Sequence, residues 1–283
     1  NDDLQPAIAI QPTSTPAEGN SGTTPYTFTV SLSNPSDQSI TVGFATEDGT
    51  AIAGEDFTAQ TGSLTFAPGE TSKTITVNVT GDTKREQDET FSVRLTNPTQ
   101  ATIGTATATA TIGNDDDPPR VSVQAGSAIE GNSGNTPIQF RITLSSPSDQ
   151  AVVVTYSTED GTATIADQDY EAVTANTITF AAGETEKIVT VNAKGDVKRE
   201  VDEVFTLKLD NATNATIATA TANGMIQNDD SIPSVSVQSV SVDEGGALSF
   251  VVELSSTSDE EVSVNFATSD GTATIADQDY TSN

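Results

Sequence analysis

The stretch Tyr26-Thr27-Phe28-Thr29-Val30-Ser31-Leu32 alternates apolar residues with small polar ones. Side chains of an extended strand point alternately to its two faces, so a period of two predicts a strand with one buried face. The same alternation returns at Val42 to Phe44, Leu64 to Phe66, Ile75 to Val79 and Phe91 to Leu95. Turn-forming clusters separate these segments, and a threonine-rich segment from Ala106 to Ile112 brings the number of strands to about seven. The pattern predicts an immunoglobulin-like antiparallel β-sandwich.

A repeated motif sets the size of this domain. Asp48-Gly49-Thr50-Ala51 recurs from Asp160 and again from Asp270. The spacing is that of one sandwich domain, which indicates a tandem array. The loop that begins Gly81-Asp82 has its counterpart at Gly195-Asp196, with basic and acidic residues at the same offsets.

The repeats divide the chain into four segments. Asn-Asp-Asp closes each full copy, at 114–116 and 228–230, and also begins the chain. We expect residues 1–3 to be the tail of a preceding repeat, 4–117 and 118–231 to be complete repeats 1 and 2, and 232–283 to be a truncated repeat 3. Prolines in the spacers, such as Pro118-Pro119, predict an elongated array, and the partial third copy is expected not to fold when isolated.

The composition excludes several classes of function. A formal net charge of −30, from 41 acidic and 11 basic residues, argues against binding to nucleic acid or to anionic lipid. Neither cysteine nor histidine is present, so thiol and imidazole chemistry is excluded, and any metal must be held by oxygen ligands. No apolar run approaches the ~18 residues of a membrane-spanning helix, so no membrane insertion is expected from this segment.

Acidic residues gather at the ends of the predicted strands. If their loops share one pole of the sandwich, two carboxylates ~4 Å apart repel by about 4 kcal/mol at an effective dielectric near 20. Ca²⁺, which accepts six to eight oxygens in irregular geometry, would offset that repulsion better than Mg²⁺. Two plainer explanations stand beside this one. Asp48-Gly49 is typical of a simple turn, and Lys84-Arg85 could neutralise the acids through an internal salt bridge.

The ordered motifs resemble those of the Calx-beta domain. The resemblance rests on Glu47 to Ala51, on Phe66 to Thr71, on Gly81-Asp82, on Glu86-x-Asp88-Glu89-x-Phe91 and on Asn114 to Asp116, and it extends over both full copies and the partial third. It implies a seven-stranded immunoglobulin-like sandwich that binds Ca²⁺ at the pole near its C-terminal end. Such domains occur as calcium sensors in sodium/calcium exchangers, in integrin β4 and in large bacterial surface proteins.

The resemblance also implies a set of ligands, carried over by motif. In repeat 1 they are Glu18, Asp56, Asp82, Glu86, Glu89, Asp115 and Asp116, with Asp117 joining from the linker. In repeat 2 they are Glu130, Asp169, Asp196, Glu200, Glu203, Asp229 and Asp230, whereas repeat 3 keeps only Glu244 and Asp279. Asn114 and Gly81 stand where the calcium-sensing domain of the exchangers has acids, so we expect two or fewer Ca²⁺ ions per domain. The basic pair does not fall on a ligand position of the motif.

We weigh three functions. The favoured one is a structural and adhesive array, extracellular or on a bacterial-type cell surface, in which Ca²⁺ stiffens the joints between neighbouring repeats and a surface or matrix component is a further partner. The alternative is a regulatory Ca²⁺ sensor of a membrane transporter or signalling protein. Catalysis by paired carboxylates is set aside, because the acids recur in every copy and the chain has no tryptophan to form a sugar platform. A cadherin-like rod is the alternative fold.

Overall fold

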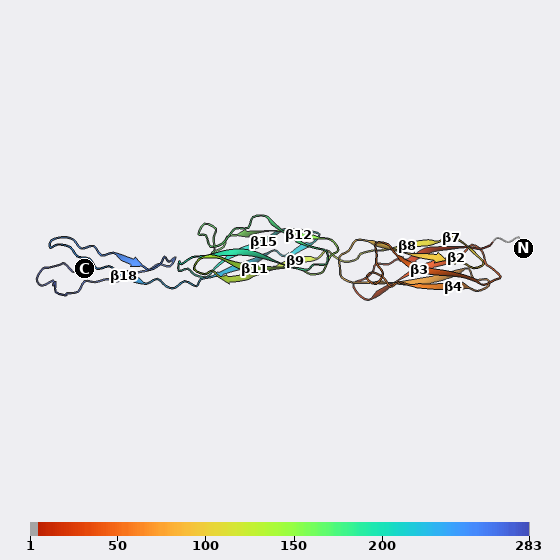
Figure 1. Ribbon diagram of the computed structural model, residues 1–283, viewed down its shortest axis with the longest axis horizontal. Helices are drawn as coiled ribbons and strands as arrows, with labels where there is room; N and C mark the ends of the chain where they lie inside the picture. The colour runs from red at the N-terminus through yellow and green to blue at the C-terminus, as the bar shows by residue number, and fades with distance from the viewer. Residues whose placement is uncertain (1–4, 283) are drawn as a thin grey trace.

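The computed structural model describes residues 5–282 and shows domains that follow one another along a single long axis (Figure 1). Its regular elements are all strands, and no described residue lies in a helix that could cross a membrane. Residues Asn1 to Asp3, expected as the tail of a preceding repeat, lie outside the described residues. The predicted all-β fold and elongated tandem arrangement are confirmed.

Repeat 1 forms two facing sheets of four strands each. One sheet has the order β5-β2-β1-β7 and the other β4-β3-β6-β8. The bounds are β1 Ala7–Ser14, β2 Thr23–Leu32, β3 Ile40–Asp48, β4 Thr61–Phe66, β5 Ser72–Thr80, β6 Glu89–Thr96, β7 Thr102–Thr105 and β8 Thr107–Ile112. The threonine-rich segment passes from one sheet to the other, so β7 pairs parallel with β1 whereas β8 pairs antiparallel with β6.

The core lies between the two sheets. Along β2 the residues Tyr26, Phe28 and Val30 are fully buried, which is the face that the alternating pattern predicts. Phe91 of β6 contacts three aromatic rings from the opposite sheet and from the loop after β3. Burial of such side chains is the main favourable term in folding, at roughly 25 cal/mol per Å² of apolar surface.

Repeat 2 repeats the same plan. Its sheets have the orders β14-β11-β9-β16 and β10-β17-β15-β12-β13. The bounds are β9 Arg120–Gln124, β10 Gly126–Ile129, β11 Gly134–Leu144, β12 Val152–Glu159, β13 Asn176–Phe180, β14 Glu186–Gly195, β15 Glu203–Thr213, β16 Thr216–Thr219 and β17 Thr221–Gln227. The additional strand β10 lies parallel to β17 and leads directly into the loop that contains Glu130.

The recurring Asp-Gly-Thr-Ala motif forms a turn rather than a ligand loop. Asp48 Oδ1 accepts a hydrogen bond from the backbone N–H of Ala53 at 3.1 Å, and Asp160 Oδ1 accepts the Tyr170 hydroxyl at 2.6 Å. A Cβ at Gly49 would overlap the carbonyl oxygen of Thr90, so only glycine fits against β6 there. The motif is therefore structural, as the plainer explanation holds.

The partial third repeat does not bury a core among its described residues. Its two strands, β18 Val235–Val237 and β19 Val252–Leu254, have three residues each. Phe250 remains 56% exposed and Phe266 75% exposed, because the described segment supplies no second sheet to cover them. This is the physical basis for expecting the third copy not to fold alone.

Backbone hydrogen bonds connect successive repeats directly. The loop between β5 and β6 pairs with the turn before β12, where Arg85 and Ser148 form a parallel bridge. Arg199 and Ser258 form the same bridge between repeats 2 and 3. Each repeat thus contacts the next through the same two segments, as well as through the covalent linker.

Candidate metal centre

Four loops of each repeat bring acidic side chains to the pole that faces the next repeat. In repeat 1 these loops follow β1, β3, β5 and β8 and carry Glu18, Asp56, Glu86 and Asp115 respectively. The strands fix the loops in space, because a carboxylate at the end of a paired strand can move little along the strand axis. Segments far apart in sequence therefore meet at one end of the sandwich.

The first cluster consists of Glu18, Asp115 and Asp116, and its counterpart in repeat 2 consists of Glu130, Asp229 and Asp230. Within each, one carboxylate oxygen per residue lies within 4.8 Å of the others. Backbone and amide donors orient the aspartates: Gly19 N–H donates to Asp115 Oδ1 at 3.2 Å, and Asn20 Nδ2 donates to Asp116 Oδ1 at 2.7 Å.

The second cluster consists of Asp56, Glu86 and Glu89, with Asp169, Glu200 and Glu203 as its counterpart in repeat 2. The same spacing of 4.8 Å or less holds for its carboxylate oxygens. Asp56 Oδ2 accepts the backbone N–H of Ile52 at 2.6 Å, which closes the loop after β3. Glu86 is 8% exposed and Glu200 6%, so both carboxylates face into the protein rather than into solvent.

An aromatic residue anchors the aspartate of this second cluster. Phe57 follows Asp56 directly and stacks on Phe91, with ring centroids 4.6 Å apart. In repeat 2, Tyr170 follows Asp169 and stacks on Phe205 at 4.3 Å. The Asp-Phe/Tyr pair of the motif therefore links a core contact to a site residue, because the buried ring fixes the backbone on which the carboxylate stands.

An asparagine connects the two clusters of each repeat. Asn114 Oδ1 accepts the backbone N–H of Glu86 at 2.9 Å, and its Nδ2 donates to the backbone oxygen of Asp116 at 3.1 Å. Asn228 makes the equivalent bonds to Glu200 and Asp230 at 3.0 and 3.2 Å. An amide both donates and accepts, whereas an aspartate at this position could not donate to a backbone oxygen. The asparagine is thus a bridge between clusters.

Gly81 explains another departure from the exchanger pattern. A Cβ on Gly81 would overlap the carbonyl oxygens of Glu18 and Gly19, and one on Gly195 would overlap those of Glu130 and Gly131. The loop after β5 therefore lies against the loop after β1 with no space for a side chain. In this chain an acid at position 81 cannot be accommodated without moving the loop of Glu18.

Burial and mutual repulsion raise the pKa values of acids in both clusters. The pKa of Glu18 is raised to about 7 by burial, with further contributions from Glu86 and Asp82. The pKa of Glu130 is raised to about 8, again mainly by burial and then by Glu200 and Asp196. Burial followed by the neighbouring aspartate also raises the pKa of Glu89 and of Glu203 to about 7.

Three carboxylate oxygens of the first clusters are buried without a hydrogen-bond partner among the described residues. They are Oδ2 of Asp116, Oε1 of Glu130 and Oδ2 of Asp230. Glu130 is only 2% exposed, so its charged form is shielded from bulk solvent, and no described residue donates to that oxygen. An unpaired buried charge is costly, and a divalent cation with oxygen ligands would relieve it. The donor set, three carboxylates per cluster, fits Ca²⁺.

The loop lysine forms the internal salt bridge that the plainer explanation of the basic pair anticipates. Although the pair does not fall on a ligand position of the motif, Lys84 Nζ lies 2.5 Å from Glu86 Oε1 and Lys198 Nζ 2.8 Å from Glu200 Oε1. The long lysine side chain reaches back from its own loop to a glutamate two residues away. An internal salt bridge therefore engages one acid of each second cluster, and this ammonium would compete with a metal ion for that acid.

Three of the ligands expected in the two complete repeats lie outside the clusters, as do Glu244 and Asp279 of repeat 3. Asp82 Oδ1 and Asp196 Oδ1 accept the backbone N–H groups of Lys84 and Lys198, each at 2.7 Å, and so shape the loop. They nevertheless repel Glu18 and Glu130, which places them near the site. Asp117 is exposed in the linker. The remaining twelve expected ligands are those of the four clusters, and their role as ligands stays a prediction.

Sequence reasoning missed the polar residues that support the site. Asn20 and Asn132 orient an aspartate of the first cluster. Asn114 and Asn228 were noted only as missing acids. The signal that could have identified the first two was their recurrence in Glu-Gly-Asn, at 18–20 and 130–132.

We expect the metal-free protein to become more stable as the pH falls from about 8 to about 5. The folded-state pKa values of Glu18 and Glu130, about 7 and 8, lie above the ordinary value of 4.5, so the folded chain takes up protons before the unfolded chain does. The stabilisation is complete below pH 4.5 and is lost as the pH rises through the folded values. Urea unfolding in the presence of a chelator at pH 8, 6.5 and 5 measures it. Equal urea midpoints at the three pH values would contradict the raised pKa values of Glu18 and Glu130.

The Calx-beta domain family model matches residues 2–117, 114–230 and 227–283. The chain is therefore a tandem array of Calx-beta domains and belongs to that family.

Its curated relatives include sodium/calcium exchangers. It is 31% identical over 194 residues to sodium/calcium exchanger 1 of Bos taurus, a match that spans 59% of this chain and 19% of the exchanger. It is 31% identical over 165 residues to the exchanger Calx of Drosophila melanogaster, across 58% of this chain and 17% of that protein. The chain thus spans about a fifth of the length of these relatives.

The solved structures that the chain matches include two from Calx proteins. The calcium binding domain CBD12 of CALX1.1 is 24% identical, covers 72% of this chain and 79% of its own, and superposes with a TM-score of 0.36. The apo-form Calx CBD1 domain is 30% identical, covers 39% of this chain and 99% of its own, and has a TM-score of 0.33.

These comparisons correct the expected location. The sequence led us to expect an extracellular or surface array of bacterial type, and that expectation is wrong, because the relatives found are sodium/calcium exchangers of mammals and of Drosophila. Tandem repetition and the absence of cysteine would suit an exported array, but they do not establish one. Neither property is specific to exported proteins.

Proposed function

We propose that the two complete repeats bind Ca²⁺ and act as a regulatory calcium sensor rather than as an enzyme. The observation that supports this most directly is the pair of three-carboxylate clusters in each repeat, of which that of Glu130 contains a buried oxygen without a partner. The family match to Calx-beta domains and the likeness to sodium/calcium exchangers support the ion and the regulatory role. No described contact or relative supports an adhesive surface ligand.

The position of the clusters suggests how a signal would leave the site. Both clusters lie at the pole that contacts the next repeat, and Glu86 is one residue from the Arg85 bridge across the joint. A ligand shifts a conformational equilibrium only through different contacts in the two states. Neutralising the acids at the pole changes contacts beside the joint, so ion binding can alter how firmly two repeats are held.

A calcium-stiffened spacer is the second candidate, and the backbone bridges at both joints favour it. Affinity separates the two functions. Sensor sites of calcium-binding proteins have dissociation constants of about 10⁻⁷–10⁻⁵ M, whereas structural extracellular modules bind at about 10⁻⁴–10⁻³ M.

Calorimetric titration of the full chain with Ca²⁺ should show at most two ions per complete repeat, with dissociation constants in the micromolar range or below. Mg²⁺ should bind much more weakly, because it requires near-octahedral geometry that loops of carboxylates do not supply. The double variant Glu18→Gln with Glu130→Gln should lose the first-cluster ions. No heat of binding in the unaltered chain would rule out the proposal, and millimolar affinity would favour the spacer.

A further inference from the structure

The turn after β11 in repeat 2, and its counterpart after β19 in repeat 3, contact the acidic loop of the repeat before them. At the first joint, Arg85 N–H donates to Pro147 O at 3.1 Å, and Asp149 N–H donates to Arg85 O at 2.9 Å. At the second joint, Arg199 N–H donates to Thr257 O and Asp259 N–H to Arg199 O, both at 3.0 Å. The backbone geometry is the same at both joints, although Pro147 is replaced by threonine.

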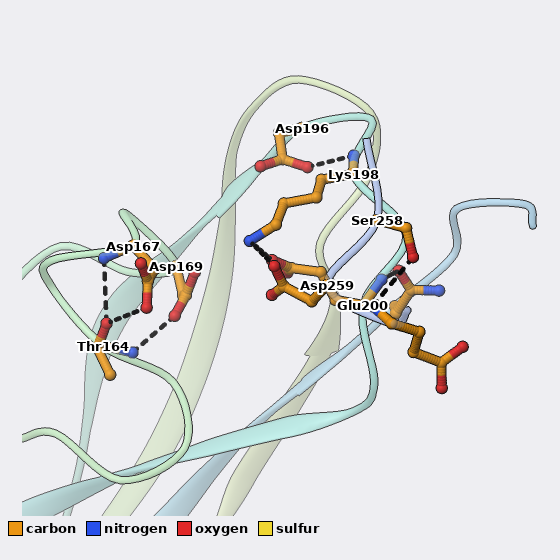
Figure 2. A network of polar contacts seen from close by, with 10 residues as sticks. Thr164, Asp167, Asp169, Asp196, Lys198, Glu200, Ser258 and Asp259 are labelled. Carbon is orange, nitrogen blue, oxygen red and sulfur yellow. Dashed lines mark hydrogen bonds and ion pairs between the residues drawn. The ribbon is translucent and has the colours of Figure 1, made fainter. Parts of the chain in front are cut away.

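This contact places an aspartate of the following repeat beside the second cluster. At the second joint, Asp259 Oδ1 lies 2.6 Å from Lys198 Nζ, which also lies 2.8 Å from Glu200 Oε1 (Figure 2). The ammonium group is therefore shared between an acid of the cluster and an acid of the next repeat.

The first joint contains the same groups in a different pairing. Lys84 contacts Glu86, and Asp149 uses Oδ2 to accept the backbone N–H of Gln87 at 3.1 Å. Oδ1 of Asp149 is buried and has no hydrogen-bond partner among the described residues. A second acceptor for the lysine is thus present at this joint but is not engaged by it.

The two pairings have different consequences for an incoming cation. While Lys84 holds Glu86, an ion must displace the ammonium group before it can use that carboxylate. A displaced ammonium group at a partly buried position needs a new acceptor, since leaving a charge unpaired there is costly. Asp259 shows that the aspartate of the next repeat can supply this acceptor.

We propose that Asp149 and Asp259 are positioning residues for the second cluster of the preceding repeat: each accepts the loop lysine across the joint and so frees the cluster glutamate to bind a cation. This inference rests on the proposed calcium binding and adds that each second cluster depends on the following repeat. Ion binding then exchanges a salt bridge within one repeat for a salt bridge between two repeats.

Repeat 1 supplies a matched control. Asp37 occupies the position of Asp149 in a turn of the same geometry, where Gln38 N–H donates to Ser36 Oγ at 3.0 Å, as Gln150 N–H does to Ser148 Oγ at 3.1 Å. Asp37 is exposed and contacts no acidic loop within the described residues. Asp37→Asn therefore removes the same charge without touching either of the two described joints.

The test is a Ca²⁺ titration of the ¹⁵N-labelled full chain, followed by NMR at the amides of Gly81 and Gly195, which report on the two repeats separately. Asp259→Asn should raise the half-saturating Ca²⁺ concentration at Gly195 about fivefold, the lower end of typical coupling between sites, and leave Gly81 unchanged. Asp149→Asn should raise the half-saturating Ca²⁺ concentration at Gly81 and leave that at Gly195 unchanged. Asp37→Asn should change neither.

A double-mutant cycle separates positioning from direct ligation. In the Lys198→Met background, Asp259→Asn should have little further effect, because the ammonium group that it accepts is gone. An equal loss of affinity with and without Lys198 would overturn the inference and make Asp259 a direct ligand. An unchanged Gly195 titration in the single variant would overturn it too. If the unaltered chain shows no response to Ca²⁺, the proposed function itself fails.

Discussion

Glu130→Gln is expected to raise the stability of the metal-free protein and, at the same time, to abolish much of the stabilisation by Ca²⁺. The Glu130 side chain is 2% exposed, and its Oε1 has no hydrogen-bond partner among the described residues. Its ionised form is therefore destabilising without a cation, and a neutral amide of the same shape removes that cost. The same carboxylate is a candidate ligand, so its loss weakens the site.

The two effects have opposite signs, which makes the result diagnostic. Removing the unpaired charge should stabilise the metal-free chain at pH 8 by roughly 1–3 kcal/mol, the usual cost of a buried unsatisfied group. Ca²⁺ at a hundred times its dissociation constant should stabilise the unaltered repeat by about 2.7 kcal/mol, and the variant by much less. Thermal unfolding with chelator and with Ca²⁺ measures both quantities.

Asp210→Asn is the matched control, because Asp210 is an exposed acid on β15 of the same repeat and the substitution changes the charge equally. It should leave both quantities nearly unchanged. If Glu130→Gln lowered the stability of the metal-free protein, the ionised carboxylate would be stabilising in the folded state, which contradicts an unpaired buried oxygen. If the response to Ca²⁺ persisted in full, Glu130 would not be a ligand.

Gly81→Ala should destabilise repeat 1 and displace its first cluster. A Cβ at this position would overlap backbone oxygens of Glu18 and Gly19, and backbone atoms cannot move aside as a flexible side chain can. Overpacking of this kind costs roughly 1–3 kcal/mol. Because Glu18 belongs to the loop that must move, Ca²⁺ affinity should fall as well.

Gly113→Ala is the control for this substitution. Gly113 lies at the same pole, but a Cβ built there has no atom within 4 Å outside its chain neighbours. Urea unfolding and Ca²⁺ titration should distinguish the two variants, and Gly195→Ala should reproduce the effect in repeat 2. If Gly81→Ala matched Gly113→Ala in stability and in affinity, the close approach of the two loops would not exist in solution.

The joints connect the candidate site to the rest of the array. Repeats 1 and 2 each touch the next repeat through Arg85 or Arg199, in the loop that also carries Glu86 or Glu200 of the second cluster. A change at the cluster is therefore transmitted along one short loop, without a long pathway through the core. This geometry suits regulation, since ion binding would change how firmly two neighbouring repeats are held against each other.

Local sequence patterns determined the class of fold, the tandem repeat and most of the acids in the candidate site. Period-two alternation identified the buried face of β2, because strand periodicity is a property of consecutive residues. The acids that recur at the same positions in each repeat then stood out from the many other acidic residues of the chain. The location inferred from composition was wrong, since composition does not encode a cellular address.

Only the tertiary structure decided which acids meet and what else engages them. Glu18 and Asp115 are separated by most of a repeat in sequence, and their approach depends on the pairing of β1 and β8 loops at one pole. The pairing of Lys84 with Glu86, the lack of space beside Gly81 and the reach of Asp259 into the neighbouring repeat are distances between segments. A linear pattern contains no such distances, because strand register, loop shape and the docking of one repeat on the next set them.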